Sequence, residues 1–296
     1  MSLHIYADDT QIYCFFKAKS PSSADNALVA LTSCIDDVRA WMTQALLKLN
    51  EDKTEFLVLS SPYYQENLCN ISAKVGDAVI TSATQCRNLG VIFDSKLDMK
   101  AHVAAVCRSA FFQLRKISSI RKYLTEEACK TLLHSFVMSR IDYCNSLLAN
   151  LPKCVISKLQ KVQNVAARIL TRIPVFDHIS PVLIDVHWLP LPLRIRYKIN
   201  LLTFKSLHGL GPSYLSNMLT VYQPAANLRS ANKHLLQERR YRLTTYGHRA
   251  YYFTAPSFWN ELPLHLRSAT ELKTFKSGLK THLFKLFKES PASYIF

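Results

Sequence analysis

Residues 5–13 read IYADDTQIY, a run in which two aspartates lie between β-branched and aromatic residues. That composition is typical of two strands joined by a tight turn, so we expect a β-hairpin over 3–16 with Asp8 and Asp9 at its tip. Carboxylates at strand ends can present Mg²⁺ to phosphates, because Mg²⁺ prefers a few hard oxygen ligands. An Asp-Asp pair is also ordinary turn chemistry, so alone it does not identify a metal site.

The segments after the hairpin predict a small mixed region that extends to residue 97. Apolar residues recur at helical spacing over 25–49, which predicts one long helix. Short strands are predicted at 56–59, where we expect burial, and around 73–80 and 88–93. We expect these strands to complete one small sheet with the long helix packed against it.

Beyond residue 97 the apolar spacing becomes helical. The predicted helices lie at 101–120, 125–148, 153–173, 193–207 and 271–287. Thr125 is the expected N-cap of the second helix, and Gly209 and Gly211 are expected to end the fourth. The fold class is therefore α+β at the start of the chain and mostly α afterwards.

The stretch 153–173 has the clearest helical pattern. At 100° per residue its apolar side chains fall within an arc of about 140°, and its basic side chains form a separate stripe about 80° wide. The stripe consists of Lys158, Lys161, Arg168 and Arg172. It can follow nucleic-acid phosphates. The alternative is an ordinary solvent-facing surface, which basic residues favour.

Charge is distributed unevenly along the 296 residues, whose formal net charge is +16 at pH 7. Residues 1–97 hold 8 basic and 11 acidic side chains, whereas residues 98–296 hold 29 and 10. A strongly basic chain favours polyanionic partners, nucleic acid before an acidic membrane surface. We expect three regions, 1–97, 98–150 and 151–296, with carboxylate chemistry in the first and polyanion binding in the others.

A second candidate for nucleic-acid binding lies in 239–253, where basic and aromatic side chains alternate as they do in proteins that stack single-stranded bases. The alternative is a half-buried strand with a basic outer face. The candidate residues are Arg240, Arg242, Tyr246, Arg249 and Tyr251.

Other features exclude several classes of protein. The 8 cysteines include no Cys-x-x-Cys pair and no zinc-ligand spacing, so we expect reduced thiols. No run of 18 apolar residues predicts a transmembrane helix, and the first ten residues do not resemble a signal peptide. We expect an intracellular protein, nuclear or cytoplasmic or both, that is not secreted and has no membrane partner.

Six short segments of the sequence, taken in chain order, carry a family resemblance. They are IYADDTQIY (5–13), LKLNEDKTEF (47–56), NLGVIFD (88–94), RIDYCN (140–145), LQKVQN (159–164) and APSFWNELP (255–263). In this order they resemble the carboxy-terminal part of the reverse transcriptases of jockey-like non-LTR (LINE-type) retrotransposons. The resemblance spans essentially the whole chain. It implies a truncated polymerase palm at 1–97, a helical thumb-like region at 98–150 and a basic, mostly helical region at 151–296.

The resemblance also implies roles for residues of the hairpin. Asp8 matches the metal-binding aspartate of the family, and Asp9 matches its neighbour, which shapes the site and completes the catalytic pair. Tyr6 and Ala7 match positions near the primer end and the incoming nucleotide.

Two later residues match functional positions as well. Lys53 matches a lysine that protonates the pyrophosphate leaving group; the alternative is a solvated lysine beside Glu51 and Glu55. Gly90 matches the turn of the primer grip, where only glycine lets the backbone turn and approach the primer closely.

The resemblance implies an RNA-directed DNA polymerase, a nucleotidyltransferase that uses Mg²⁺, an RNA template, a DNA primer and deoxynucleotides. The sequence departs from the family by lacking the fingers and the strand with the other essential aspartate. We therefore expect a fragment of a transposable element, or a gene model begun at an internal methionine, that does not polymerise alone. A non-catalytic RNA- or DNA-binding remnant is the alternative, and a helical protein-interaction module is a third.

Overall fold

The computed structural model of the chain describes residues 1–17, 19–65, 68, 71–76, 78–224, 233–241, 243 and 245–295. It contains helices and small antiparallel hairpins, so the chain is a mixed α and β protein, as expected at this level. It divides into two compact units, Met1–His102 and Val103–Phe296. No helix among the described residues is long and apolar enough to cross a membrane.

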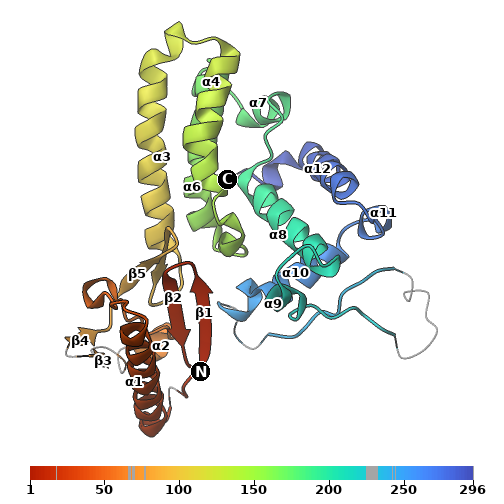
Figure 1. Cartoon of the computed structure of the whole chain (residues 1–296). Helices are drawn as coiled ribbons and strands as arrows, with labels where there is room; N and C mark the ends of the chain where they lie inside the picture. The colour runs from red at the N-terminus through yellow and green to blue at the C-terminus, as the bar shows by residue number, and fades with distance from the viewer. Residues whose placement is uncertain are drawn as a thin grey trace. The chain divides into compact units, whose positions relative to one another are not determined.

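The first unit, as far as it is described, holds three separate two-stranded antiparallel sheets (Figure 1). Its strands are β1 (Ser2–Tyr6), β2 (Asp9–Tyr13), β3 (Ser72–Val75), β4 (Ala78–Thr81), β5 (Gln85–Asn88) and β6 (Val91–Asp94). Its helices are α1 (Pro21–Gln44), a 3₁₀ turn at Glu51–Lys53 and α2 (Pro62–Gln65). The predicted hairpin and the predicted long helix are both confirmed.

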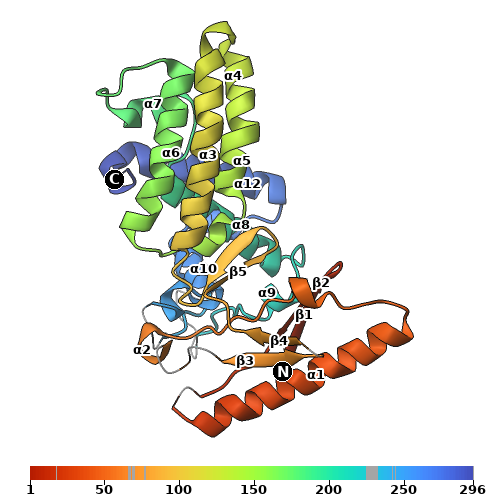
Figure 2. The same cartoon turned by 90° about the vertical axis from the view of Figure 1, so that its left-hand side faces the viewer.

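The expectation of one sheet is wrong. Each strand pairs with its neighbour in the chain, and residues 56–59 form only an isolated bridge, Leu57 to Ala83, instead of a buried strand. Strands of four or five residues can pair through a tight turn, whereas joining the hairpins needs contacts that no local pattern encodes. The helix does pack on a hairpin: α1 lies along β3 (Figure 2), with Leu31, Ala73 and Val75 buried.

The second unit is mostly helical. Its longer helices are α3 (Lys100–Ile120, which begins in the first unit), α4 (Glu126–Leu133), α6 (Lys153–Thr171), α8 (Leu191–Leu207), α10 (Tyr251–Asn260) and α12 (Leu272–Glu289). Shorter helices are α5 (Ser139–Asp142), α7 (Ile179–Asp185), α9 (Ser213–Ser216) and α11 (Leu264–Arg267). Single 3₁₀ turns lie at Arg121–Tyr123, Asn145–Leu148, Gly247–Arg249 and Pro291–Ser293.

The predicted helix 125–148 ends early in the structure. Thr125 is its N-cap, as expected, and accepts a hydrogen bond from the Ala128 backbone N–H (3.2 Å). The helix continues from α4 through a widened π-type turn at His134–Met138 into α5, which ends at Asp142. Tyr143 is extended and Cys144 is left-handed (φ 51°), so the backbone leaves the helix there.

Helix α8 organises the core of the second unit, because α6, α9, α10 and α12 all contact it (Figure 1). The ring of Phe204 stacks on Phe275 with centroids 4.3 Å apart, and Trp259 lies 5.7 Å from Phe275. All three side chains are buried. The helix ends at Leu207, and Gly209 follows with φ 67°, as the sequence predicted.

Candidate functional site

The Asp-Asp hairpin has a two-residue turn. Tyr6 pairs with Asp9 at the end of the ladder, so Ala7 and Asp8 form the turn, and Ala7 adopts a left-handed φ of 52°. All four side chains are exposed, that of Tyr6 by 64%. The carboxylates of Asp8 and Asp9 are thus presented to solvent from the tip of a short rigid ladder.

Strand β5 brings three of the resemblance blocks together. The Gln11 side chain, in β2, donates from Nε2 to Oδ1 of Asn88 (3.0 Å), 77 residues away. The Arg87 backbone N–H donates to Oε2 of Glu55 (3.1 Å). The hairpin block therefore contacts β5 at Asn88, where the 88–94 block begins, and the 47–56 block contacts the same strand at Arg87.

Lys53 closes the 3₁₀ turn, where its backbone N–H donates to Oδ1 of Asn50 (3.2 Å). Its two acidic neighbours have other partners: Glu51 pairs with Arg39 (3.1 Å), and Glu55 binds β5. The Lys53 side chain is exposed. Among the described residues no hydrogen bond or ion pair joins it to the aspartates of the hairpin tip.

The turn between β5 and β6 depends on glycine. Asn88 pairs with Val91, so Leu89 and Gly90 form a two-residue turn, with φ of 44° and 83°. Positive φ at both central positions is the geometry of a type I′ turn, which suits the twist of a hairpin. Leucine already adopts an unfavourable conformation at the first position, so glycine is required at the second.

Gly90→Ala should lower the free energy of unfolding of the first unit by about 1–2 kcal/mol, because alanine is strained at this φ. Amide hydrogen exchange of β5 and β6 measures the effect. Gly211→Ala is the control, since Gly211 is not among the glycines with positive φ. Unchanged exchange in the Gly90 variant would contradict the role given to this turn.

Asp94, at the end of the same block, orders the chain that leads into α3. Its carboxylate accepts hydrogen bonds from the backbone N–H groups of Lys96 (3.1 Å), Asp98 (2.9 Å) and Met99 (2.8 Å). Leu97 and Met99 have positive φ, so this carboxylate holds a strained turn in place. Sequence reasoning assigned Asp94 no separate role.

The acidic groups do not form a complete metal site. In the part of the chain that the structure describes, no group of three or more His, Cys, Asp or Glu side chains could hold a metal ion. Asp8 and Asp9 are two carboxylates at one exposed tip, whereas two Mg²⁺ ions need ligands from more than one element. The described residues therefore do not fit the two-ion site that the resemblance implies.

The basic stripe of α6 is divided in the structure. Lys158, Lys161 and Arg172 are exposed, and Arg168 is half-buried. Lys158 lies near Cys107 of α3, since its charge lowers the pKa of that thiol, although burial raises the pKa overall. Arg168 and Arg172 lie at the other end of the helix. At 1.5 Å per residue they are about 15 Å or more from Lys158 along the helix axis.

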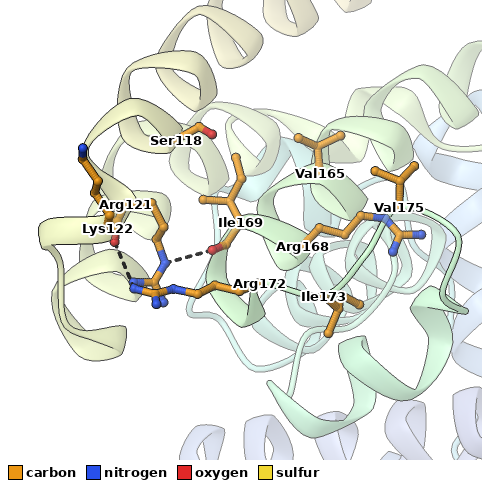
Figure 3. Close-up of a pocket in the computed structure, with 9 residues that line it drawn as sticks. All are labelled: Ser118, Arg121, Lys122, Val165, Arg168, Ile169, Arg172, Ile173 and Val175. Atoms are coloured by element: carbon orange, nitrogen blue, oxygen red, sulfur yellow. Dashed lines mark hydrogen bonds between the residues drawn. The ribbon is translucent and has the colours of Figure 1, made fainter.

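Two residues that the sequence analysis missed join this end of the stripe. Arg121 and Lys122, in the turn after α3, line one pocket with Arg168 and Arg172, whose cavity volume is about 600 Å³ (Figure 3). We call this the basic pocket. The spacing of the residues gives no signal for it, because the pocket forms only when the ends of α3 and α6 meet.

The aromatic segment is folded against the protein. The Tyr241 ring lies edge-on to Phe253 with centroids 4.7 Å apart, and the Tyr251 hydroxyl contacts that of Ser206 (3.5 Å). Burial raises the pKa of Tyr251. Tyr246 and Arg249 are half-buried.

The strand alternative for this segment is wrong, because a 3₁₀ turn and α10 occupy residues 247–260. Backbone bonds from Gly247 to Leu243 and from Ala250 to Tyr246 already curl the chain into turns there. The Arg240 side chain is exposed, and Arg242 lies outside the described residues.

The block at 140–145 joins two helices. Both carboxylate oxygens of Asp142 accept hydrogen bonds from Arg194 of α8, in a bidentate pair. Asn145 donates to the same carboxylate (3.3 Å). Burial lowers the pKa of His134 nearby, and the Arg194 charge lowers it further.

The block at 255–263 holds a distant segment of chain. Trp259 donates from Nε1 to the His234 carbonyl (2.9 Å). Asn260 pairs with both backbone groups of Leu236 at 2.9 Å. The blocks at 140–145 and 255–263, two of the three in the second unit, thus join distant segments of the chain.

Comparisons with protein-family models, with curated proteins and with solved structures found no match to this chain.

Proposed function

We propose that the chain contributes to a reverse transcriptase of the jockey-like non-LTR (LINE-type) class, and that its own part is to hold nucleic acid. The observation that carries the proposal is the convergence of three ordered blocks on β5. The hairpin, the 47–56 block and the 88–94 block resemble successive parts of one polymerase palm. Their contact through Gln11, Asn88 and Glu55 is what a shared site requires.

The proposal assigns RNA template and DNA primer as partners. The turn at Leu89–Gly90 would approach the primer, because glycine leaves its backbone accessible. Asp8 and Asp9 would contribute carboxylates to Mg²⁺ in a complete palm. Since the described residues do not supply the remaining ligands, we derive no catalytic step for this chain.

A second candidate function is nucleic-acid binding without catalysis. The charge of residues 98–296 favours this function, because they contain 29 basic side chains and only 10 acidic ones. Such a surface binds polyanions with an affinity that falls as salt rises.

One experiment tests both candidates: primer extension on an RNA template with Mg²⁺, run beside filter retention of the same RNA over a range of salt. We compare the chain with Asp8→Ala and with Asp37→Ala, which removes an exposed carboxylate from α1. We expect salt-sensitive retention by all three proteins and extension by none. Primer extension that depends on Asp8 would overturn the conclusion that the metal site is incomplete. Retention that is absent or indifferent to salt would overturn nucleic-acid binding.

A further inference from the structure

The basic pocket lies where the carboxyl ends of α3 and α6 meet. Four cationic side chains line it, and the apolar side chains include Ile169 and Val175. Figure 3 shows Arg121 and Arg172 together on one side, and Arg168 beside Val175 on the other. The pocket therefore has cations at both ends and an apolar surface between them.

Backbone carbonyls hold the arginines of the pocket in place. Arg121 donates to the carbonyls of Leu124 (2.8 Å), Ile169 (2.9 Å) and Leu170 (2.8 Å). The Arg172 guanidinium donates to the Arg121 carbonyl (3.3 Å). Each guanidinium has five N–H groups, so donors remain for an anion after these bonds form.

No carboxylate is among the described residues that line the basic pocket. Within the described part of the chain, no ion pair joins any of its four cations to an acidic residue. Burial raises the pKa of the Cys129 thiol; the nearby charges of Arg121 and Arg172 oppose that rise, and the charge of Glu126 adds to it. Like charges so close together repel one another, and a bound anion would relieve that repulsion.

An exposed aromatic residue adjoins the pocket in the sequence, because Phe176 follows Val175, which lines the pocket. Arg168 donates to the carbonyls of Pro174 (3.1 Å) and Asp177 (2.9 Å), and so fastens the loop that carries Phe176. The Phe176 side chain is 98% exposed. An exposed aromatic ring, next in the chain to a residue of a cationic pocket, is a surface on which a single-stranded base can stack.

We propose that the basic pocket binds a single-stranded stretch of nucleic acid, with phosphates on the four cations and a base stacked on Phe176. This rests on the proposed function and deepens it, because it places the nucleic acid on one surface of the second unit. A duplex fits less well, since its bases are already stacked and cannot lie on the ring. A membrane surface offers phosphates but no bases. The effect of substituting Phe176 therefore distinguishes nucleic acid from a membrane as the ligand.

The test uses the whole chain and a fluorescein-labelled oligouridylate, with the dissociation constant followed by anisotropy over a range of KCl. The double variant Lys122→Gln/Arg172→Gln removes two charges from the pocket. We expect about 10-fold weaker binding near physiological salt, and a salt slope smaller by about 1.4, at about 0.7 for each single-strand phosphate contact. The matched control Lys273→Gln/Lys276→Gln removes two exposed charges from α12, outside the pocket, and should change affinity less than about 3-fold.

Phe176→Ala should weaken single-strand binding at least about 5-fold, since base stacking on an aromatic side chain has an effect of that order. It should leave duplex binding unchanged. Thermal unfolding of each variant separates lost binding from lost folding.

Equal losses of affinity in the two double variants would overturn the proposal that the basic pocket binds the nucleic acid, although the proposed function would stand. No binding by the unsubstituted chain would overturn both. Binding of phosphatidylserine vesicles through the same charges, indifferent to Phe176, would assign the pocket to a membrane and overturn this inference.

Discussion

Gln160→Leu will lower the free energy of unfolding of the second unit by about 3 kcal/mol. Gln160 is fully buried, and its Oε1 accepts from the Leu191 backbone N–H (2.7 Å). Its Nε2 donates to Gln163 (3.0 Å) and to Asn164 (2.8 Å). Leucine satisfies none of these partners, and each buried polar group left without one costs about 1–3 kcal/mol.

The same network reaches the residues before α8. Gln163 donates from Nε2 to the Leu189 carbonyl (2.8 Å), so the two glutamines hold the chain on both sides of Pro190. Urea unfolding followed by tryptophan fluorescence measures the loss, because Trp188 is buried beside this segment. Lys161→Gln is the control, since its side chain is exposed. A loss below about 1 kcal/mol would show that other groups replace the glutamine.

Trp259→Ala will have the largest effect on stability, about 4 kcal/mol, because truncating a buried tryptophan leaves a large cavity. Only 1% of Trp259 is exposed, and its ring lies against Phe275. The variant also leaves the His234 carbonyl without its hydrogen bond. Urea unfolding measures this loss too.

Two further variants make the second prediction specific. Trp259→Phe keeps much of the ring contact but loses the hydrogen bond, so it should cost about half as much. Phe176→Ala truncates an aromatic side chain that is 98% exposed, and should change stability by less than about 0.5 kcal/mol. If Trp259→Ala were as mild as Phe176→Ala, the described core around Phe275 would be wrong.

Periodicity predicted the helices well and the buried polar residues poorly. Helix α6 runs from Lys153 to Thr171, close to the predicted range. Gln160 and Gln163 are buried on it, although the prediction placed only apolar side chains in the packed arc. At 100° per residue Gln163 lies within that arc, whereas Gln160 lies about 40° beyond its edge, so helical position would have found the first and not the second.

Contacts between distant segments of the chain could not be predicted from the sequence. The hairpin turn at Asp8 was predicted, because turn chemistry is local. Residues 88–93 were predicted as one strand, which is wrong, because Leu89 and Gly90 turn the chain between β5 and β6; only the resemblance pointed to a turn there. The link from Gln11 to Asn88 was not predicted, and neither was the meeting of Arg121 with Arg172. Both depend on how elements dock, and a pattern along one element does not specify that.

Arg121 contributes a positive charge to the basic pocket and also stabilises the carboxyl end of α6. The last turn of α6 leaves backbone carbonyls without helical partners, and the guanidinium of Arg121 satisfies those of Ile169 and Leu170. The exposed Lys122 next to it makes no such bond among those described. Selection for folding alone would therefore retain Arg121 and leave Lys122 free to change. A positive charge at position 121 is thus no evidence of a ligand by itself.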